Sequence, residues 1–161
     1  MAEAPKILII YYSKTGTTKK LVDIIKSHIT ADLHLIVPEK EYPEGYFTSG
    51  ILNLFRSENP PKNGIPDITP YDIILIGTPI WNGGLSTPMK SFLDRLDIKG
   101  KKIGVFSTNR GGGDSGPHSD LIKRYPHSTV YPDFLTLNSK VYDGSEAPVL
   151  EWLNKIGLLP Q

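Results

Sequence analysis

The stretch KILIIYYSKTGTTKKLVDIIKSHI, residues 6–29, contains the pattern on which the fold prediction rests. Its first part, KILIIYY, is a nearly continuous apolar run, typical of a strand buried on both faces of a sheet. Its last part places Leu21, Ile24, Ile25 and Ile29 on one stripe, which predicts an amphipathic helix. A buried strand, a short loop and a helix together form the first half of a βαβ unit.

The same alternation continues along the chain. Further β-rich runs lie at residues 32–38, 71–78, 101–108 and, more weakly, 128–137. Helical patterns lie at residues 86–97 and 144–159, and another helix is expected from Asp114 onward. Strands that alternate with helices predict a three-layer α/β/α fold with a doubly wound, parallel sheet of five strands.

We expect a single domain over residues 1–161, because this length is ordinary for one domain. Residues 42–70 interrupt the alternation with many prolines and glycines around one short apolar piece, GILNLF. They predict a long connection that holds at most one short helix. A loop of this length is either functional or a packed surface crossover.

Composition excludes several classes of protein. The chain has no cysteine, which rules out disulfides, thiol catalysis and cysteine-ligated metals. It has 18 basic and 17 acidic side chains without a basic stripe, so nucleic acid is not an expected partner. No apolar run reaches the roughly 20 residues of a membrane span. The first residues, MAEAPKILII, do not resemble a signal peptide, so we expect a cytoplasmic protein.

In a doubly wound sheet, ligands bind at the carboxyl ends of the strands. The first loop there, SKTGTT at residues 13–18, holds four hydroxyl side chains around Gly16 at the expected start of a helix. Helix N-termini offer free N–H groups to an anion, and glycine lets a phosphate approach the backbone closely. Capping alone needs one hydroxyl. The four hydroxyls therefore favour a phosphate site that needs no buried cation.

Two further loops are expected at the same edge of the sheet. In residues 77–88, Trp81 precedes Asn82-Gly83-Gly84, and we expect an exposed indole that stacks on a flat ligand, the alternative being a packed residue. In residues 107–116, three consecutive glycines offer backbone N–H groups next to Asn109 and Arg110. Together the three loops predict a site for a flat heteroaromatic with a phosphate tail.

These motifs resemble the flavodoxin-like family. SKTGTT matches the family's phosphate loop, [ST]-x-T-G-x-T, and residues 76–96 and 99–116 are similar to its second and third flavin loops. The resemblance covers nearly the whole chain. It implies an open, five-stranded parallel sheet with strand order 2-1-3-4-5 that binds FMN non-covalently.

Carried over by position, the resemblance implies three groups of FMN-binding residues and neither a catalytic side chain nor a metal. The phosphate would be surrounded by Ser13, Lys14, Thr15, Gly16, Thr17 and Thr18, with Lys14 contributing mainly its backbone N–H. The isoalloxazine would be lined by Pro79, Ile80, Trp81, Asn82 and Gly83, and its N5 would meet the Asn82-Gly83 peptide. The pyrimidine edge would be bordered by Thr108, Asn109, Arg110, Gly111, Gly112 and Gly113.

The chain departs from electron-carrying flavodoxins, which are usually strongly acidic, because its net charge is +1. Arg110 lies where the third loop would approach flavin N1 and O2, and it either raises the reduction potential there or reaches into solvent. The third loop also lacks the tyrosine that many flavodoxins stack on the ring. An uncovered flavin face would admit a substrate.

Three functions remain open from the sequence. The first is a flavodoxin-like carrier that passes electrons between partner proteins. The second is an FMN-dependent reductase that takes hydride from NAD(P)H and reduces a quinone-like or nitro acceptor. The third is a domain that has lost FMN and acts as a binding or regulatory module. The sequence also leaves open whether the protein is a monomer or a homodimer.

Overall fold

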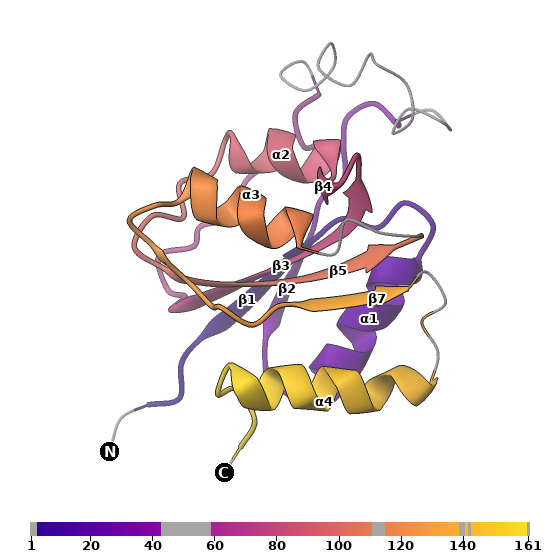
Figure 1. The fold of residues 1–161 in the computed structure, drawn as a ribbon. Helices are drawn as coiled ribbons and strands as arrows, with labels where there is room; N and C mark the ends of the chain where they lie inside the picture. Colours follow the sequence, from indigo (N-terminus) through magenta and orange to yellow (C-terminus); the bar gives the residue numbers. More distant parts are fainter. Residues whose placement is uncertain (1–2, 43–58, 111–114, 139–140, 142, 161) are drawn as a thin grey trace.

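The computed structural model describes residues 3–42, 59–110, 115–138, 141 and 143–160 (Figure 1). The strands are β1 (Ile7–Tyr11), β2 (Asp32–Leu35), β3 (Ile73–Trp81), β4 (Gly84–Leu85), β5 (Lys102–Asn109), β6 (Thr129–Val130) and β7 (Leu135–Asn138). The helices are α1 (Thr17–Lys26), α2 (Thr87–Leu93), α3 (Gly116–Arg124) and α4 (Glu146–Lys155), with a short 3-10 helix at Asp143–Ser145.

The sheet has the order β2-β1-β3-β5-β6, and all of these neighbours pair in parallel. This is the 2-1-3-4-5 order that the resemblance implies, and the prediction of a doubly wound parallel sheet is confirmed. Within the described residues the sheet holds seven strands instead of the expected five, for two reasons. β4 folds back on β3 as a short antiparallel arm. The fifth position on β5 is divided between β6 and β7, separated by a stretch that contains Pro132, which cannot donate a ladder hydrogen bond.

Helices cover both faces of the sheet, with α2 and α3 on one face and α1 and α4 on the other (Figure 1). The core is accordingly split into two clusters. Leu8 and Ile10 of β1 belong to the cluster that contains the buried residues of α2 and α3. Ile7 and Ile9 belong to the cluster that contains those of α1 and α4. Alternate residues of a strand point to opposite faces, so a continuous apolar run is what a sheet covered on both sides requires.

The long connection is only partly described, because residues 43–58, including the apolar piece expected to form a short helix, lie outside the described residues. Asn59 at its end is 4% exposed and is bonded at both ends of its amide. It accepts a hydrogen bond from Lys40 N and donates one to Lys40 O, both at 2.8 Å. Its carbonyl accepts a hydrogen bond from Ser91 Oγ of α2. These hydrogen bonds therefore attach the C-terminal end of the undescribed segment to Lys40, which precedes it, and to α2. Among the described residues, none of the helices is both long and apolar enough to cross a membrane.

His34 on β2 makes the stability of the fold depend on pH. Its ring packs 5.4 Å from that of Phe92, and its Nε2 is buried without a hydrogen-bond partner among the described residues. Burial lowers the pKa of His34 below its ordinary value of 6.5, and a backbone hydrogen bond with Gly64 opposes this shift. Above pH 6.5 the ring is neutral in both states. Below it the unfolded chain takes up the proton first, so the free energy of unfolding falls as pH falls through the folded-state pKa.

We therefore expect the parent protein to lose stability between pH 7.5 and 5 more steeply than the variant His34→Gln, which cannot titrate. The measurement is urea unfolding at several pH values, with the difference between the two proteins isolating His34 from the other titrating groups. Parallel stability curves over this range would show that His34 is not responsible.

Candidate functional site

The sheet brings the three predicted loops to one edge, because they follow β1, β3 and β5, which are parallel neighbours. The first and third loops touch although β3 lies between their strands. Thr18 Oγ1 and Thr108 Oγ1 share a hydrogen bond of 3.1 Å. Tyr12, which lies between β1 and the first loop, contacts Trp81 of the second loop, and their ring centroids are 5.7 Å apart. Residues from distant parts of the sequence are thus assembled into one rim.

The start of α1 presents backbone donors to the outside. Gly16 is the N-cap residue in the left-handed conformation, with φ of 89°, and as a glycine it has no side chain that could cap the helix. Lys19 N–H donates to Ser13 Oγ at 3.2 Å. No described residue accepts a hydrogen bond from the N–H of Gly16, Thr17 or Thr18. A Cβ built on Gly16 would meet nothing within 4 Å. The loop is therefore an open cradle of N–H groups at the positive end of a helix dipole.

The side chains of this loop divide into two sets. The hydroxyls of Ser13, Thr15 and Thr17 lie at or near the surface, and those of Thr15 and Thr17 are 3.3 Å apart. The Thr18 hydroxyl is buried against Thr108, so Thr18 can offer a ligand only its backbone N–H. The Lys14 ammonium donates a hydrogen bond to the carbonyl of Tyr42. The described cradle therefore relies on backbone and hydroxyl groups.

Trp81 is placed differently from the sequence expectation. The expectation of an exposed indole is wrong, because Trp81 is only 7% exposed and belongs to a core cluster. The rings of Tyr12 and Tyr42 approach it edge-on, at centroid distances of 5.7 and 5.8 Å. Burial is the largest cause that raises the pKa of Tyr12 above its ordinary value of 10, and electrostatic interactions with Tyr42 and Glu41 raise it further. Tyr12 is therefore a neutral phenol at neutral pH. A contact between Trp81 and a flavin ring stays a prediction.

Sequence reasoning did not single out Tyr12 and Tyr42 as residues of this rim. Tyr12 directly follows the last residue of β1, and this position could have identified it as a rim residue. Tyr42 carried no comparable signal, because its contact with Trp81 joins parts of the chain that are far apart in sequence.

The rest of the second loop is a tight turn. Pro79 and Ile80 are half-buried near the end of β3, whereas Asn82 and Gly83 are exposed. Asn82 and Gly83 both have left-handed backbone, with φ of 53° and 73°. Asparagine and glycine are the residues that tolerate this conformation best. The Asn-Gly pair in the sequence is therefore explained first by the turn geometry, and its contact with a flavin stays a prediction.

The third loop is described only at its beginning. Thr108 is buried, Asn109 is half-buried and Arg110 is exposed where β5 ends. Gly111, Gly112 and Gly113 lie outside the described residues, so their predicted place at a pyrimidine edge is untested. The helix expected after this loop is present as α3, which begins at Gly116 instead of Asp114.

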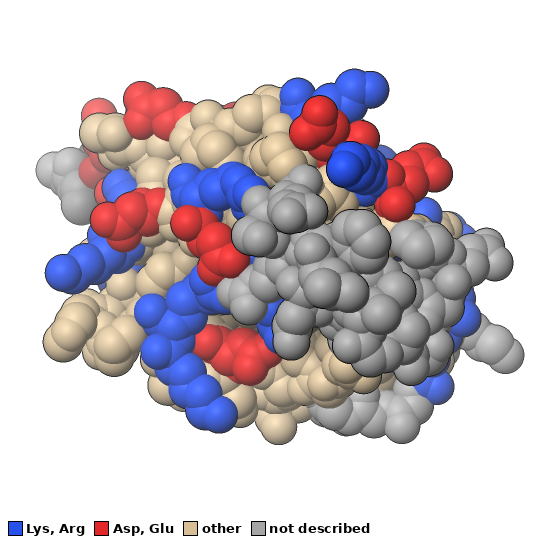
Figure 2. All heavy atoms as spheres, turned by 90° about the horizontal axis from the view of Figure 1, so that it is seen from above, with Lys and Arg blue, Asp and Glu red and all other residues tan. Residues whose placement is uncertain are grey.

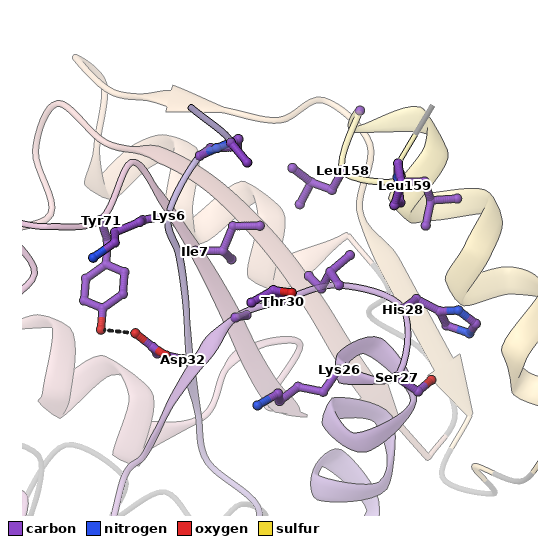
Figure 3. A pocket seen from close by; sticks show the side chains of 16 residues that line it. Lys6, Ile7, Lys26, Ser27, His28, Thr30, Asp32, Tyr71, Leu158 and Leu159 are labelled. Atoms are coloured by element: carbon purple, nitrogen blue, oxygen red, sulfur yellow. Dashed lines mark hydrogen bonds between the residues drawn. The ribbon is translucent and has the colours of Figure 1, made fainter. Parts of the chain in front are cut away.

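A separate hollow of about 820 Å³ lies at the opposite edge of the sheet, where the strands begin (Figure 3). It is bordered by the first residues of β1 and β2, the end of α1 and the end of the chain after α4. Tyr71 there donates a hydrogen bond of 2.7 Å to Asp32 (Figure 3). This hollow is distinct from the rim formed by the three loops.

Solved structures share this architecture across nearly the whole chain. A candidate flavoprotein from Bacteroides eggerthii is 25% identical, with a TM-score of 0.72, over 94% of this chain and 97% of that one. A flavoprotein from Lactobacillus acidophilus, solved in complex with FMN, is 26% identical, with a TM-score of 0.66, over 92% and 99%. A flavodoxin, WrbA-like protein from Agrobacterium tumefaciens shares the fold at 19% identity, with a TM-score of 0.64, over 94% of each chain.

The sequence itself matches a family model over residues 5–142, which extend from just before β1 to just before the 3-10 helix. That range contains all three loops of the rim. The described parts of the rim have a helix that begins after the N-cap glycine Gly16, a left-handed turn after β3 and a polar end to β5. This chain therefore belongs to the NADPH-dependent FMN reductase family and has the flavodoxin-like fold.

Proposed function

We propose that this chain binds FMN non-covalently at the rim formed by the loops after β1, β3 and β5, and that it works in the cytoplasm as an NAD(P)H-dependent oxidoreductase. The family to which it belongs supports both the cofactor and the reductant. The absence of cysteine suits a reducing compartment. When bound, FMN would accept hydride from a nicotinamide and pass electrons to a quinone-like or nitro acceptor.

The single observation that carries the proposal is the cradle at the start of α1. A phosphate needs several donors and room to approach the backbone. The N–H groups of Gly16, Thr17 and Thr18 have no partner among the described residues, and the space at the Cβ position of Gly16 is open. Ser13, Thr15 and Thr17 add hydroxyls nearby. The residues present therefore fit the phosphate end of FMN.

The remaining rim residues would hold and shield the ring. The Asn82-Gly83 turn is exposed beside the buried Trp81, so its backbone can meet the edge of a flat ligand. The hydrogen bond between Thr18 and Thr108 fixes the distance between the phosphate loop and the strand that leads to the third loop. Tyr12, a neutral phenol at neutral pH, is buried beside Trp81 and adds no charge to the rim.

The charge distribution supports an enzyme over a carrier. Carriers of this fold are expected to be acidic, whereas this chain has a net charge of +1. On the face above α2 and α3, the described acidic and basic side chains are interspersed (Figure 2). A mixed surface gives weak long-range attraction to a charged partner protein, whereas a small acceptor needs none.

Anaerobic titration tests the proposal. The purified protein is saturated with FMN, and the 450 nm band is followed as NADPH or NADH is added, then a soluble quinone. We expect NADPH or NADH alone to bleach the band, with quinone restoring it. Reduction only after a partner reductase is added would identify a carrier. Failure to take up FMN would contradict the proposal and favour a binding module.

Arg110 is expected to raise the reduction potential of the bound flavin. A cation about 6 Å from the ring at an effective dielectric constant of ~20–40 contributes roughly 1.4–3 kcal/mol, or about 60–120 mV for a one-electron couple. Because Arg110 is exposed, solvent and salt screen it and the lower end applies. The variant Arg110→Gln should therefore show a potential about 60 mV more negative.

Lys26→Gln is the matched control, because it also removes one exposed cation but lies beside the hollow at the opposite edge of the sheet. Its potential should equal that of the parent. Equal potentials for Arg110→Gln and the parent, measured against a reference dye, would show that the guanidinium points into solvent.

A further inference from the structure

The hollow at the edge of the sheet where the strands begin has the size of a small-molecule site, and the proposed function does not use it. Its volume of about 820 Å³ lies within the range of ligand pockets, roughly 300–1,000 Å³. It is lined by residues 4–7, by residues 26–32 between α1 and β2, by Tyr71, and by residues 157–160 after α4. None of these residues belongs to the three loops of the rim.

The wall that follows α4 has a defined backbone. Gly157 has a φ of 75°, and its N–H donates a hydrogen bond of 3.0 Å to the Asn154 carbonyl. The Leu158 N–H donates one of 2.9 Å to the Leu153 carbonyl. These two bonds form a Schellman motif, which ends a helix and turns the chain. Leu158 and Leu159 are then half-buried against the core cluster of α1 and α4, so this wall is apolar and structured.

The floor of the hollow is apolar as well. Ile7 at the start of β1 is buried in the same core cluster, and so are Ile29 and Ala31 between α1 and β2. His28 lies among them, but its Nε2 is 2.8 Å from Glu146 Oε1, so α4 holds this ring. The floor and the two leucines after α4 therefore offer burial to the apolar part of a ligand.

Charged groups lie on the other side of the hollow. Figure 3 shows Lys6, Lys26 and Asp32 on the side opposite the two leucines. Asp32 is the one acidic residue among the described lining residues, and its Oδ2 accepts the 2.7 Å hydrogen bond from Tyr71. The ammonium groups of Lys6 and Lys26 have no partner among the described residues. Two unpaired cations beside one hydrogen-bonded carboxylate give this side an excess of positive charge.

A ligand that matches this side carries one negative charge. The last turn of α1 borders the hollow with the negative end of its helix dipole, which Lys26 in that turn offsets. A doubly charged phosphate would exceed the remaining positive charge, whereas a carboxylate matches it. We propose that the hollow is a second binding site for an amphipathic carboxylate, such as a medium-chain fatty acid. Its carboxylate would lie at Lys6 and Lys26, and its chain would lie against the floor and the leucines after α4.

The first experiment is an NMR titration of the purified chain with decanoate, octanoate and decanol, and it needs no FMN. The amides of Ala31 and Gly157 report on the hollow, and those of Gly16 and Gly83 report on the rim. We expect saturable, one-to-one binding that shifts the first pair only. Each added CH₂ should tighten binding about fourfold, so decanoate should bind roughly fifteenfold more tightly than octanoate. Two exposed ion pairs should make decanoate bind about tenfold more tightly than decanol.

The second experiment repeats the titration with the double variant Lys6→Gln/Lys26→Gln. Its affinity for decanoate should fall about tenfold, to that for decanol, while its affinity for decanol stays at the parent value. Lys20→Gln is the matched control, because Lys20 is also an exposed cation of α1 but does not border the hollow. It should keep the preference for decanoate.

Four results would overturn the proposal: no binding of decanoate, equal affinities for decanoate and decanol in the parent, an unchanged preference in the double variant, or shifts confined to the two rim amides. None of them bears on FMN, so the proposed function stands or falls separately.

Discussion

FMN is expected to bind this protein about a hundredfold to ten-thousandfold more tightly than riboflavin, which lacks the phosphate. A hydrogen bond to a charged group contributes roughly 1.5–3 kcal/mol. The start of α1 offers N–H groups of Gly16, Thr17 and Thr18 that have no partner among the described residues. Two such bonds to a phosphate would supply about 3–6 kcal/mol, which corresponds to this range of affinity ratios. Titration of protein fluorescence with each ligand measures the ratio.

Two variants distinguish phosphate binding by backbone and hydroxyl groups from phosphate binding by a positive charge. Thr17→Val removes a hydroxyl at the cradle and should weaken the binding of FMN about tenfold while leaving the affinity for riboflavin unchanged. Lys14→Met should change neither affinity much, because the Lys14 ammonium is bonded to the Tyr42 carbonyl. Loss of the FMN preference in Lys14→Met would mean that a cation holds the phosphate. Equal binding of FMN and riboflavin by the parent would contradict the cradle altogether.

Phe106→Ala is expected to lower the free energy of unfolding by about 3–5 kcal/mol, the usual cost of removing a buried phenyl ring. Phe106 is fully buried on β5, and its ring packs edge-on against Trp152 of α4 at a centroid distance of 5.9 Å. Typical domains are stable by only about 5–15 kcal/mol. Urea unfolding should therefore show a large fall in midpoint, whereas the exposed Ile122→Ala should change stability by less than about 0.5 kcal/mol.

The same ring explains Gly77 on the neighbouring strand β3. A Cβ built on Gly77 would lie 2.4 Å from Phe106 Cζ, so the phenyl ring occupies the space of a side chain there. Gly77→Ala should lower the free energy of unfolding by about 1–3 kcal/mol in the parent and by less in a Phe106→Leu background. A double-mutant cycle measures this coupling. Strictly additive changes would show that the ring moves aside without cost.

The elements of the fold could largely be predicted from periodicity. The strands β1, β3 and β5 lie at the predicted apolar runs, and α1 begins at Thr17 as expected. Local patterns suffice here because a strand covered on both faces must be apolar throughout and a surface helix must be apolar on one stripe. The division of the fifth strand into β6 and β7 does not follow from the sequence, because the weak β pattern continues on both sides of Pro132.

The strands, the helices and the three loops that follow β1, β3 and β5 were predictable from the sequence, because each depends on residues close together in the chain. Which side chains of those loops are available depends on how distant segments pack. Trp81 is buried because Tyr12 and Tyr42 reach it from other segments. Thr18 faces Thr108 across β3. Gly116 fits against Gly83 because two backbones converge. Exposure and backbone contact are set by packing between segments distant in sequence, which no local pattern records.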